Sequence, residues 1–297
     1  MKTYSSKEVA EIFNCNESTV RRWTYKGMLQ CHKTPGGHRQ FSLYDLRQFI
    51  SKHQPRYKNK ILALNSDKTN PINNFISASD YPMLAKSLME ISLAGDDYAI
   101  KNMINKLYLS GTKLYKIFDD IVEKNYDLIE SLLKKNKISH SEEYVARKLV
   151  TRSIESLCEN KPNMPNKTKR ALCVNFEENL PDIGIVMTEV ILRHLDYNVY
   201  NTGSQAKLGN FNNLVKKQKI NLLIFYLCNR QCCNAITSNN LEKTSTEIDA
   251  IINYSSQNNM KILFGGEGVK LIENKNLNLK NTFTSYKDLE RLMDRMN

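Results

Sequence analysis

Two polar, proline-containing stretches divide this chain of 297 residues into blocks whose apolar residues recur with different spacings. One stretch runs from Lys52 to Asn74 and the other from Asn160 to Lys167. Such segments carry too few apolar side chains to bury a core of their own, and we interpret both as linkers. The predicted parts are residues 1–53, a linker at 54–79, residues 80–160 and residues 169–297.

Positive charge is concentrated at the start of the chain. Residues 1–60 hold 12 Lys and Arg against 4 Asp and Glu, a net charge of +8. This is two thirds of the net charge of +12 of the whole chain. A basic block joined to nearly neutral ones indicates a localised surface for a polyanion. A solvated lysine-rich surface is the plainer alternative.

The first block has the pattern of a helix-turn-helix. Ser5 and Glu8 predict a capping box at the start of one helix. In the next helix Val20 and Trp23 lie one turn apart and face inward, so its polar residues face outward. Exposed cations there can neutralise phosphates and pair with guanine edges in a major groove. The expected DNA contacts of this helix are Ser18, Thr19, Arg21, Arg22, Tyr25 and Lys26.

A basic hairpin follows the second helix. Pro35-Gly36-Gly37 predicts a tight turn, so the chain doubles back with cations near the tip. We expect Lys33, His38 and Arg39 to contact DNA from this wing. For Trp23 we favour a core anchor over base stacking.

Over residues 1–50 the chain resembles the MerR family of bacterial winged-helix regulators. The phrase Thr34-Pro-Gly-Gly-His-Arg-Gln-Phe41 is the specific part and matches members that carry a cobalamin-type sensor. The resemblance implies binding to double-stranded operator DNA. Because reading more than one half-site needs at least two protomers, we also expect a homo-oligomer, with the second block as its contact surface.

The two later blocks differ in period. Apolar stripes at helical spacing predict a four-helix bundle; they lie at 100–107, 114–122, 128–133 and 145–154. The last block alternates short apolar runs with helix-length segments, which predicts a Rossmann-like, flavodoxin-like parallel sheet. Its five expected strands are 171–176, 198–200, 221–227, 261–264 and 282–285. Ligands of such sheets bind at the carboxyl ends of the strands.

This order of domains resembles the CarH-type light-sensing repressors, which use adenosylcobalamin, and the last two blocks resemble the cobalamin-carrying modules of methyltransferases. One motif of that family consists of an acidic residue, any one residue, a His, any two residues and a Gly. Its His ligates cobalt from below. A Trp followed nine residues later by Glu-His covers the upper face of cobalamin.

The sequence departs from both motifs. With Gly184 as anchor, Asn179 stands at the acidic position and Pro181 at the histidine position. When the second motif is aligned on Glu143, Leu133 occupies the Trp position and Tyr144 occupies the His position. Tyr226 replaces a small hydroxyl residue after the third strand, whereas Gly265 and Gly266 remain, although glycines after a strand also serve plain turn geometry. Cys228, Cys232 and Cys233 are either a thiol sensor or, as we favour, ordinary residues of this rim.

Composition restricts the setting of the protein. No stretch approaches the roughly 20 apolar residues that cross a bilayer, and the N-terminus lacks a signal-peptide core. Seven scattered cysteines without paired Cys-x-x-Cys spacing argue against a zinc site or a disulfide framework. We therefore expect a cytoplasmic protein with reduced thiols, no metal and no membrane partner.

Proline has no nitrogen that can coordinate cobalt, so we expect no cofactor. The predicted function is a DNA-binding transcriptional repressor that ignores light and cobalamin and is not an enzyme. In one alternative the altered module binds another small ligand or a partner protein. The others are a cobalamin-dependent photoreceptor, a corrinoid carrier or enzyme, and an excisionase-like DNA-bending protein, which would protect an attachment site instead of a promoter operator.

Overall fold

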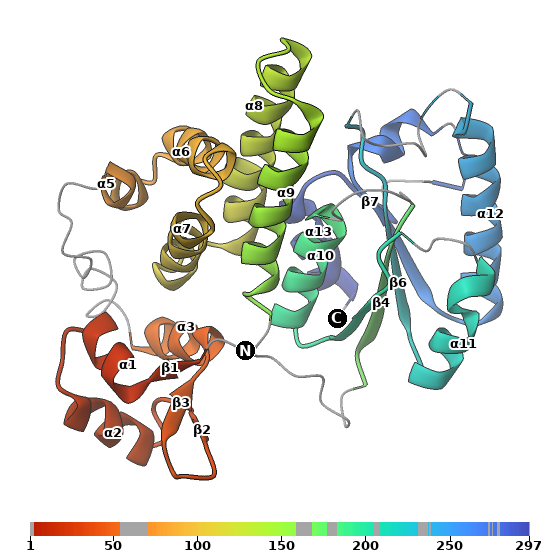
Figure 1. The fold of residues 1–297 in the computed structure, drawn as a ribbon. Coiled ribbons are helices and arrows are strands. Elements are labelled where there is room, and N and C mark those ends of the chain that lie inside the picture. Colours follow the sequence, from red (N-terminus) through yellow and green to blue (C-terminus); the bar gives the residue numbers. More distant parts are fainter. Residues whose placement is uncertain are drawn as a thin grey trace. The chain divides into compact units, whose positions relative to one another are not determined.

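The structure is a computed structural model that describes residues 3–53, 71–158, 168–176, 183–204, 208–230, 237, 239–272, 274, 276–277 and 280–296. The chain forms two compact units, Met1–Lys161 and Pro162–Asn297 (Figure 1). Among the described residues, no helix is long and apolar enough to cross a membrane.

The first unit begins with a winged helix, which we call the reader. Its helices are α1 (Ser6–Ile12), α2 (Glu17–Tyr25) and α3 (Leu43–Lys52). Three short antiparallel strands, β1 (Tyr4–Ser5), β3 (Arg39–Phe41) and β2 (His32–Lys33), pair in that order. The predicted capping box of Ser5 and Glu8 starts α1, and a second one, of Ser42 and Asp45, starts α3. Local hydrogen bonding therefore fixes where two of the three helices begin.

The rest of the first unit is helical. It comprises α5 (Pro71–Ala78), α6 (Tyr81–Leu93), α7 (Asp97–Leu109), a π-helical run η1 (Lys116–Val122) that continues into α8 (Glu123–Lys134), and α9 (His140–Glu155). The bundle prediction is confirmed, but two of the four predicted stripes belong to the continuous run from η1 to α8, and α6 supplies the remaining helix. Residues 71–78, which the sequence placed in the linker, form α5 and pack against α6.

Two residues of the predicted core stripes are exposed in the structure, whereas Ile129 and Ile154 of the same stripes are buried. Val145 was assigned to the core stripe of α9 and Leu128 to that of α8, yet they are 50% and 39% exposed. The buried face of α9 instead includes Glu143 and Arg147, which form an ion pair one turn apart. Prediction from a hydrophobic pattern assumes that charged residues are exposed. Because Glu143 and Arg147 are buried, the pattern wrongly placed Val145 on the buried face of α9.

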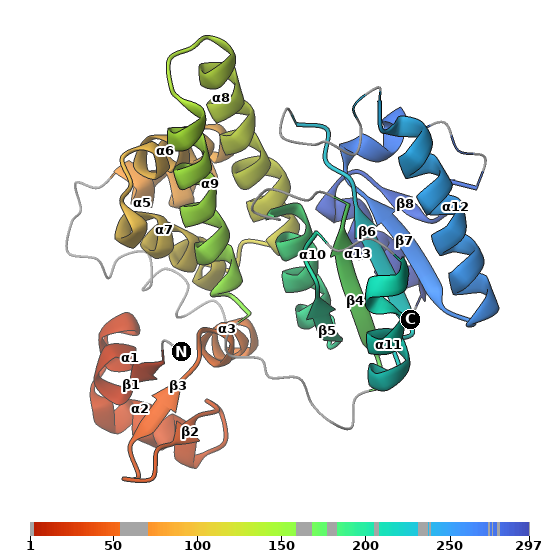
Figure 2. The ribbon, with the colours of Figure 1, turned by 45° about the vertical axis from the view of Figure 1, so that its right-hand side comes forward.

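The second unit is a parallel sheet covered on both faces. Its strands are β4 (Arg170–Asn175), β5 (Asn198–Asn201), β6 (Leu222–Tyr226), β7 (Lys261–Gly265) and β8 (Thr282–Phe283), in the order β5-β4-β6-β7-β8. Its helices are α10 (Ile183–His194), α11 (Leu208–Gln218), α12 (Leu241–Gln257), the 3-10 turn η2 (Glu267–Leu271) and α13 (Tyr286–Met296). Figure 2 shows α10 and α13 on one face and α11 and α12 on the other.

This strand order confirms the flavodoxin-like prediction. After β4 the chain adds β5 on one side and then crosses to add β6 on the other, so the order reverses between β4 and β6. Crossovers on opposite faces leave a crevice at such a switch point, beyond the carboxyl ends of the strands. That crevice is the place to look for a ligand site.

Candidate functional site

Helix α2 presents the predicted DNA contacts to solvent. Val20 and Trp23 are buried. The ring centre of Trp23 lies 4.7 Å from that of Phe49, with the rings tilted by 40°, and 5.6 Å from that of Phe13, which it meets edge-on. The role of Trp23 as a core anchor is thereby confirmed. Fixing this face inward turns the neighbouring positions outward: Ser18, Arg21, Arg22, Tyr25 and Lys26 are exposed and Thr19 is half-buried.

Arg21 has a partner that the sequence analysis did not predict. Its guanidinium lies 3.5 Å from the Glu17 carboxylate, and the side chains of Arg21 and Glu17 are 63% and 43% exposed. Exposed pairs of this kind contribute only about 0–1 kcal/mol, so a phosphate can compete for Arg21. The spacing of four residues on one helix was the signal for this pair.

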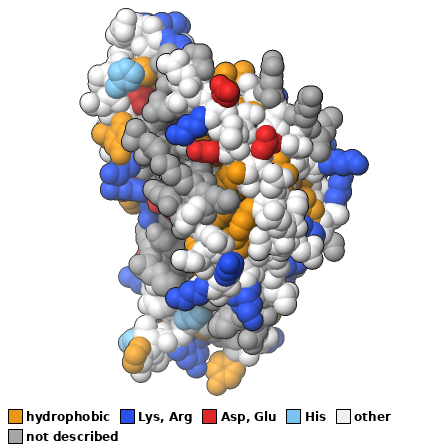
Figure 3. Space-filling model, turned by 90° about the vertical axis from the view of Figure 1, so that its right-hand side faces the viewer, with side chains coloured by type: hydrophobic (Ala, Val, Ile, Leu, Met, Phe, Trp, Pro, Cys, Tyr) orange, Lys and Arg blue, Asp and Glu red, His pale blue; other side chains and the backbone are white. Residues whose placement is uncertain are grey.

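The wing is a tight hairpin. The N–H of Thr34 donates to the His38 carbonyl at 2.9 Å, and that of Gly37 donates to the Thr34 carbonyl at 2.8 Å. Gly37 has φ +78°, a value that favours glycine, so the predicted turn is confirmed. His38 is exposed at the tip, where a turn residue can approach a groove. At the lower end of Figure 3, where the reader lies, Lys, Arg and His side chains are on the surface.

Strand register sets two cations of the wing opposite each other. Lys33 in β2 pairs directly with Arg39 in β3; Lys33 is exposed and Arg39 half-buried. Like charges at directly opposed positions of an antiparallel pair are destabilising. The wing therefore holds positive charge that disfavours its own fold and that an anion would relieve.

In the second unit, Tyr226 fills the space beside Gly184. Tyr226 ends β6 at the crevice, and a Cβ at Gly184 would overlap its ring. The hydroxyl of Tyr286 donates to the Gly184 carbonyl at 3.0 Å and lies 3.3 Å from the Tyr226 hydroxyl. The two tyrosine rings are nearly parallel, at 9°. The start of α10 is thus packed against aromatic side chains of the chain itself.

The paired glycines at the end of β7, Gly265 and Gly266, also have partners within the chain. A Cβ at Gly265 would overlap the ring of Phe283, and one at Gly266 would overlap the Leu227 carbonyl. Gly266 also has φ +93°. Close packing and backbone conformation account for both glycines without a ligand, in line with the plainer interpretation of the sequence.

The family positions in the bundle have different surroundings. Leu133 is half-buried, and Tyr144 is 40% exposed, with the Lys148 ammonium 5.9 Å from its ring centre. Glu143 is buried and bound to Arg147, whose carbonyl accepts from Thr151 at 2.9 Å. The carboxylate of Glu143 is therefore engaged inside the bundle.

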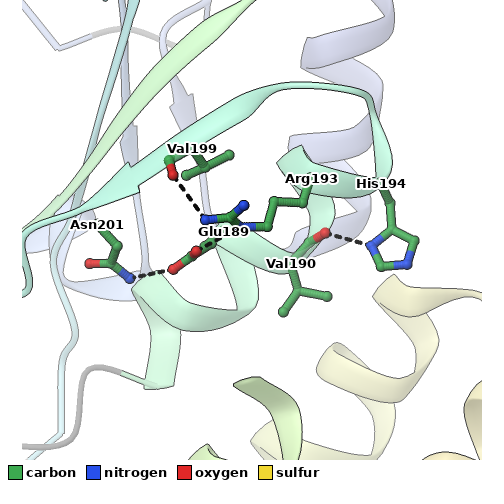
Figure 4. Close-up of polar contacts among 6 residues, drawn as sticks. All are labelled: Glu189, Val190, Arg193, His194, Val199 and Asn201. Atoms are coloured by element: carbon green, nitrogen blue, oxygen red, sulfur yellow. Dashed lines mark hydrogen bonds and ion pairs between the residues drawn. The ribbon is translucent and has the colours of Figure 1, made fainter. Parts of the chain in front are cut away.

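The His194 ring contacts a backbone carbonyl of its own helix, α10. Its Nδ1 lies 2.7 Å from the Val190 carbonyl (Figure 4). Beside it Arg193 binds the Glu189 carboxylate at 2.7 Å and the Val199 carbonyl at 2.9 Å, which joins α10 to β5. Sequence reasoning missed this clamp, whose signal was the spacing of Glu189 and Arg193. His194 has a packing role here.

The remaining predicted rim residues are partly outside the described chain. Asn179, Pro181, Cys232 and Cys233 all lie there. Cys228 is half-buried, and its sulfur accepts from the N–H of Arg230 at 3.3 Å. Within the described ranges, no cluster of three or more His, Cys, Asp or Glu could hold a metal ion.

Comparison with known proteins assigns a fold to each part. The profile of the helix-turn-helix domain family matches residues 3–54. A search of the curated proteins finds no match to this chain. Among solved structures, the monomethylamine corrinoid protein of Methanosarcina barkeri superposes with a TM-score of 0.52 at 11% identity, over 72% of this chain and 99% of that one.

Two further solved structures have lower TM-scores. A novel cobalamin-binding protein from Desulfitobacterium hafniense DCB-2 gives 0.34 at 12% identity, over 77% of this chain and 98% of that one. The methanol:cobalamin methyltransferase complex MtaBC from Methanosarcina barkeri gives a TM-score of 0.31 at 17% identity, over 72% of this chain and 79% of that one. The helix-turn-helix match and the superposition on the monomethylamine corrinoid protein together show that this chain carries a helix-turn-helix DNA-binding domain fused to a helical bundle and an α/β domain with the fold of a corrinoid protein.

Proposed function

We propose that this protein is a transcriptional repressor of the MerR type and not an enzyme, and that it binds a promoter operator as a homo-oligomer. The observation that carries the proposal is the opposed pair Lys33 and Arg39 beside the exposed cations of α2, all within the helix-turn-helix match. A phosphate oxygen near the two cations replaces their repulsion with charge-assisted hydrogen bonds. A polyanion therefore suits this charge arrangement.

The test is a gel shift on a fragment of the protein's own promoter at several salt concentrations. Each lost phosphate contact should lower the slope of log affinity against log salt by roughly one. We expect R22A, K33A and R39A to show this loss. K86A removes an exposed cation from α6 and serves as the control. An unchanged salt dependence in all three reader variants refutes DNA binding by this face.

We also propose that the module does not hold adenosylcobalamin through the lower ligand of the family, so neither light nor cobalamin is its signal. An elongated group of a cofactor has no room beside Gly184, because Tyr226 and Tyr286 stand there. In sequence, Pro181 stands where the family has its ligating histidine. The residues present therefore do not fit the cofactor in the manner of the family.

The test is incubation with adenosylcobalamin in the dark, followed by gel filtration and an absorption spectrum. We expect the protein to elute colourless and its gel shift to be the same in light and dark. Stoichiometric cobalamin absorption in the protein peak overturns this part of the proposal and favours a photoreceptor.

A cavity favours a second candidate, a repressor that responds to a different small ligand. About 580 Å³ of space lies among η2, β8 and α13. Its lining combines apolar groups such as Phe283 and Leu292 with the cations Lys270, Arg291 and Arg295 and with one acid, Asp288, which pairs with Arg291 at 3.3 Å. Pockets of this size and mixed character bind small molecules, and these cations suit an anionic one. Mass spectrometry of small molecules retained by the purified protein tests it.

A further inference from the structure

The reader is attached to the bundle by an arginine that lies outside the DNA-facing surface. Arg47 is on α3, and α3 lies next to α7 in both views (Figures 1 and 2). The guanidinium of Arg47 donates from Nη1 to the carbonyl of Tyr108 and from Nη2 to the carbonyl of Thr112 at 3.1 Å. It also lies 4.7 Å from the centre of the Tyr108 ring.

The first of these carbonyls belongs to the carboxyl end of α7, and the second belongs to the loop that follows it. Helix α7 ends at Leu109, and the last four carbonyls of any helix lack partners within it. Ser110 satisfies two of them, by its N–H to Lys106 and by its hydroxyl to Leu107. The Tyr108 carbonyl accepts both the N–H of Gly111 at 3.3 Å and the guanidinium of Arg47, which brings a positive charge to the negative end of the helix dipole. A residue of the reader thus helps to cap a helix of the bundle.

A second polar contact lies beside the first. The amide of Asn105 on α7 donates to the hydroxyl of Tyr4 on β1 at 3.4 Å. Burial raises the pKa of the Tyr4 hydroxyl and lowers the pKa of the Arg47 guanidinium, in accord with both side chains being drawn into the contact. Two different elements of the reader therefore meet one helix of the bundle.

The contact leaves the DNA-facing surface open. Arg22, Lys26, Lys33 and His38 are exposed while Arg47 is docked on α7. The docking of Arg47 therefore leaves these four side chains accessible to DNA. In the other direction, Thr112 lies in the loop that leads into η1 and α8, so any shift of that long helical run would move a carbonyl that Arg47 holds.

We propose that Arg47 is a positioning residue that fixes the reader on the carboxyl end of α7, and that the bundle controls the orientation of the reader through the carbonyls of Tyr108 and Thr112. The proposal gives the bundle a regulatory role that does not depend on which signal the α/β domain receives. Arg47 acts on DNA only through the placement of other residues.

The single tryptophan provides a test that needs no DNA. Trp23 lies in the aromatic core of the reader, so its fluorescence reports unfolding of the reader in the full chain. We expect R47A to lower the midpoint of thermal unfolding by about 4 °C or more. R47K keeps the charge but loses the forked contact to two carbonyls, so it should fall between R47A and the wild type. K52A removes an exposed cation from the same helix and should leave the midpoint within about 1 °C of the wild type.

Hydrogen exchange locates the effect on the bundle side. In R47A the amides of residues 110–115 should exchange faster than in the wild type and in K52A, although these residues belong to the bundle. A change confined to the reader would mean that Arg47 stabilises only its own domain, and the proposal would fall. Equal midpoints for R47A and K52A would also overturn it.

The DNA arm of the test rests on the proposed repressor function. R47A should bind the promoter fragment about fivefold more weakly or worse, which is the lower range of coupling between sites. Its salt slope should equal that of the wild type, because no phosphate contact is lost. A slope reduced by one would make Arg47 a DNA contact and reject its positioning role. Absence of promoter binding by the wild type refutes the repressor function alone, since the fluorescence and exchange results stand without DNA.

Discussion

Tyr226 packs its ring against Gly184, in the space that any larger side chain at residue 184 would need. This contact joins the end of β6 to the first turn of α10, at the point where the strand order reverses. In a sheet of this type the same place usually admits a ligand. Here the chain fills it with a tyrosine whose hydroxyl lies near that of Tyr286.

Substituting Gly184 tests this packing. G184A places a methyl group into the Tyr226 ring, and we expect a loss of about 1–3 kcal/mol in the free energy of unfolding. G209A is the matched control, because Gly209 lies on α11, where an added methyl group would have nothing within 4 Å, and alanine should stabilise that helix by about 0.5–1 kcal/mol. Urea denaturation followed by circular dichroism measures both. If G184A and G209A shift the midpoint alike, the tight contact is absent.

The ion pair of Glu143 and Arg147 is the most buried charge pair described in the bundle. E143Q removes the buried carboxylate charge that pairs with Arg147, and we expect a loss of about 3–5 kcal/mol in the free energy of unfolding. K86A breaks an exposed pair with Glu90 at the same spacing and should cost about 0–1 kcal/mol. A double variant, E143L with R147M, should recover much of the stability. Equal effects of E143Q and K86A would show that Glu143 is solvated.

Replacing Lys33 with Glu should stabilise the wing and weaken its binding to DNA. K33E turns the opposed cations into an attractive cross-strand pair with Arg39, which should stabilise the reader by about 0.2–1 kcal/mol. The same change should weaken the gel shift, because a negative charge now faces the phosphates. Trp23 fluorescence in a urea titration gives the first quantity. A variant that loses both stability and affinity would contradict this account of the wing.

Lys106 should make stability depend on pH. Its ammonium donates to the Asn73 side chain at 3.0 Å inside the bundle, and burial lowers the pKa of Lys106. The folded state then holds fewer protons than the unfolded one between the two pKa values, so stability from this group rises as pH rises toward the unfolded pKa of about 10.4. K106M lacks this titration. Urea unfolding at neutral pH and near pH 10 should show that the free energy of unfolding of the wild type rises relative to that of K106M. The same pH dependence in both proteins would mean that Lys106 titrates as if in water.

Local signals in the sequence predicted most of the element boundaries. The Ser5 and Glu8 pair needs only three neighbouring residues to make its hydrogen bonds, so it marked the start of α1 without tertiary information. Every strand of the second unit begins within one residue of its predicted start, because apolar runs bounded by polar ones are typical of buried parallel strands.

Other features depend on contacts that a linear pattern does not contain. Helix α5 was assigned to a linker because its segment begins with proline, yet proline is well tolerated in the first turn of a helix. Val145 was wrongly placed on the buried face of α9 because a buried carboxylate and guanidinium satisfied each other. Arg47 was not singled out at all, since its partners are backbone carbonyls more than 60 residues away, and a carbonyl has no residue type to recognise.

The outer strands of the sheet bear on how copies of this protein meet. On one side β8 is two residues long, and on the other the carbonyl of Val199 in β5 is already taken by Arg193. Short or covered edges offer little template for strand pairing with another chain, which protects against aggregation. A homo-oligomer that places two readers on one operator would therefore assemble through helices, and its sheets would stay separate.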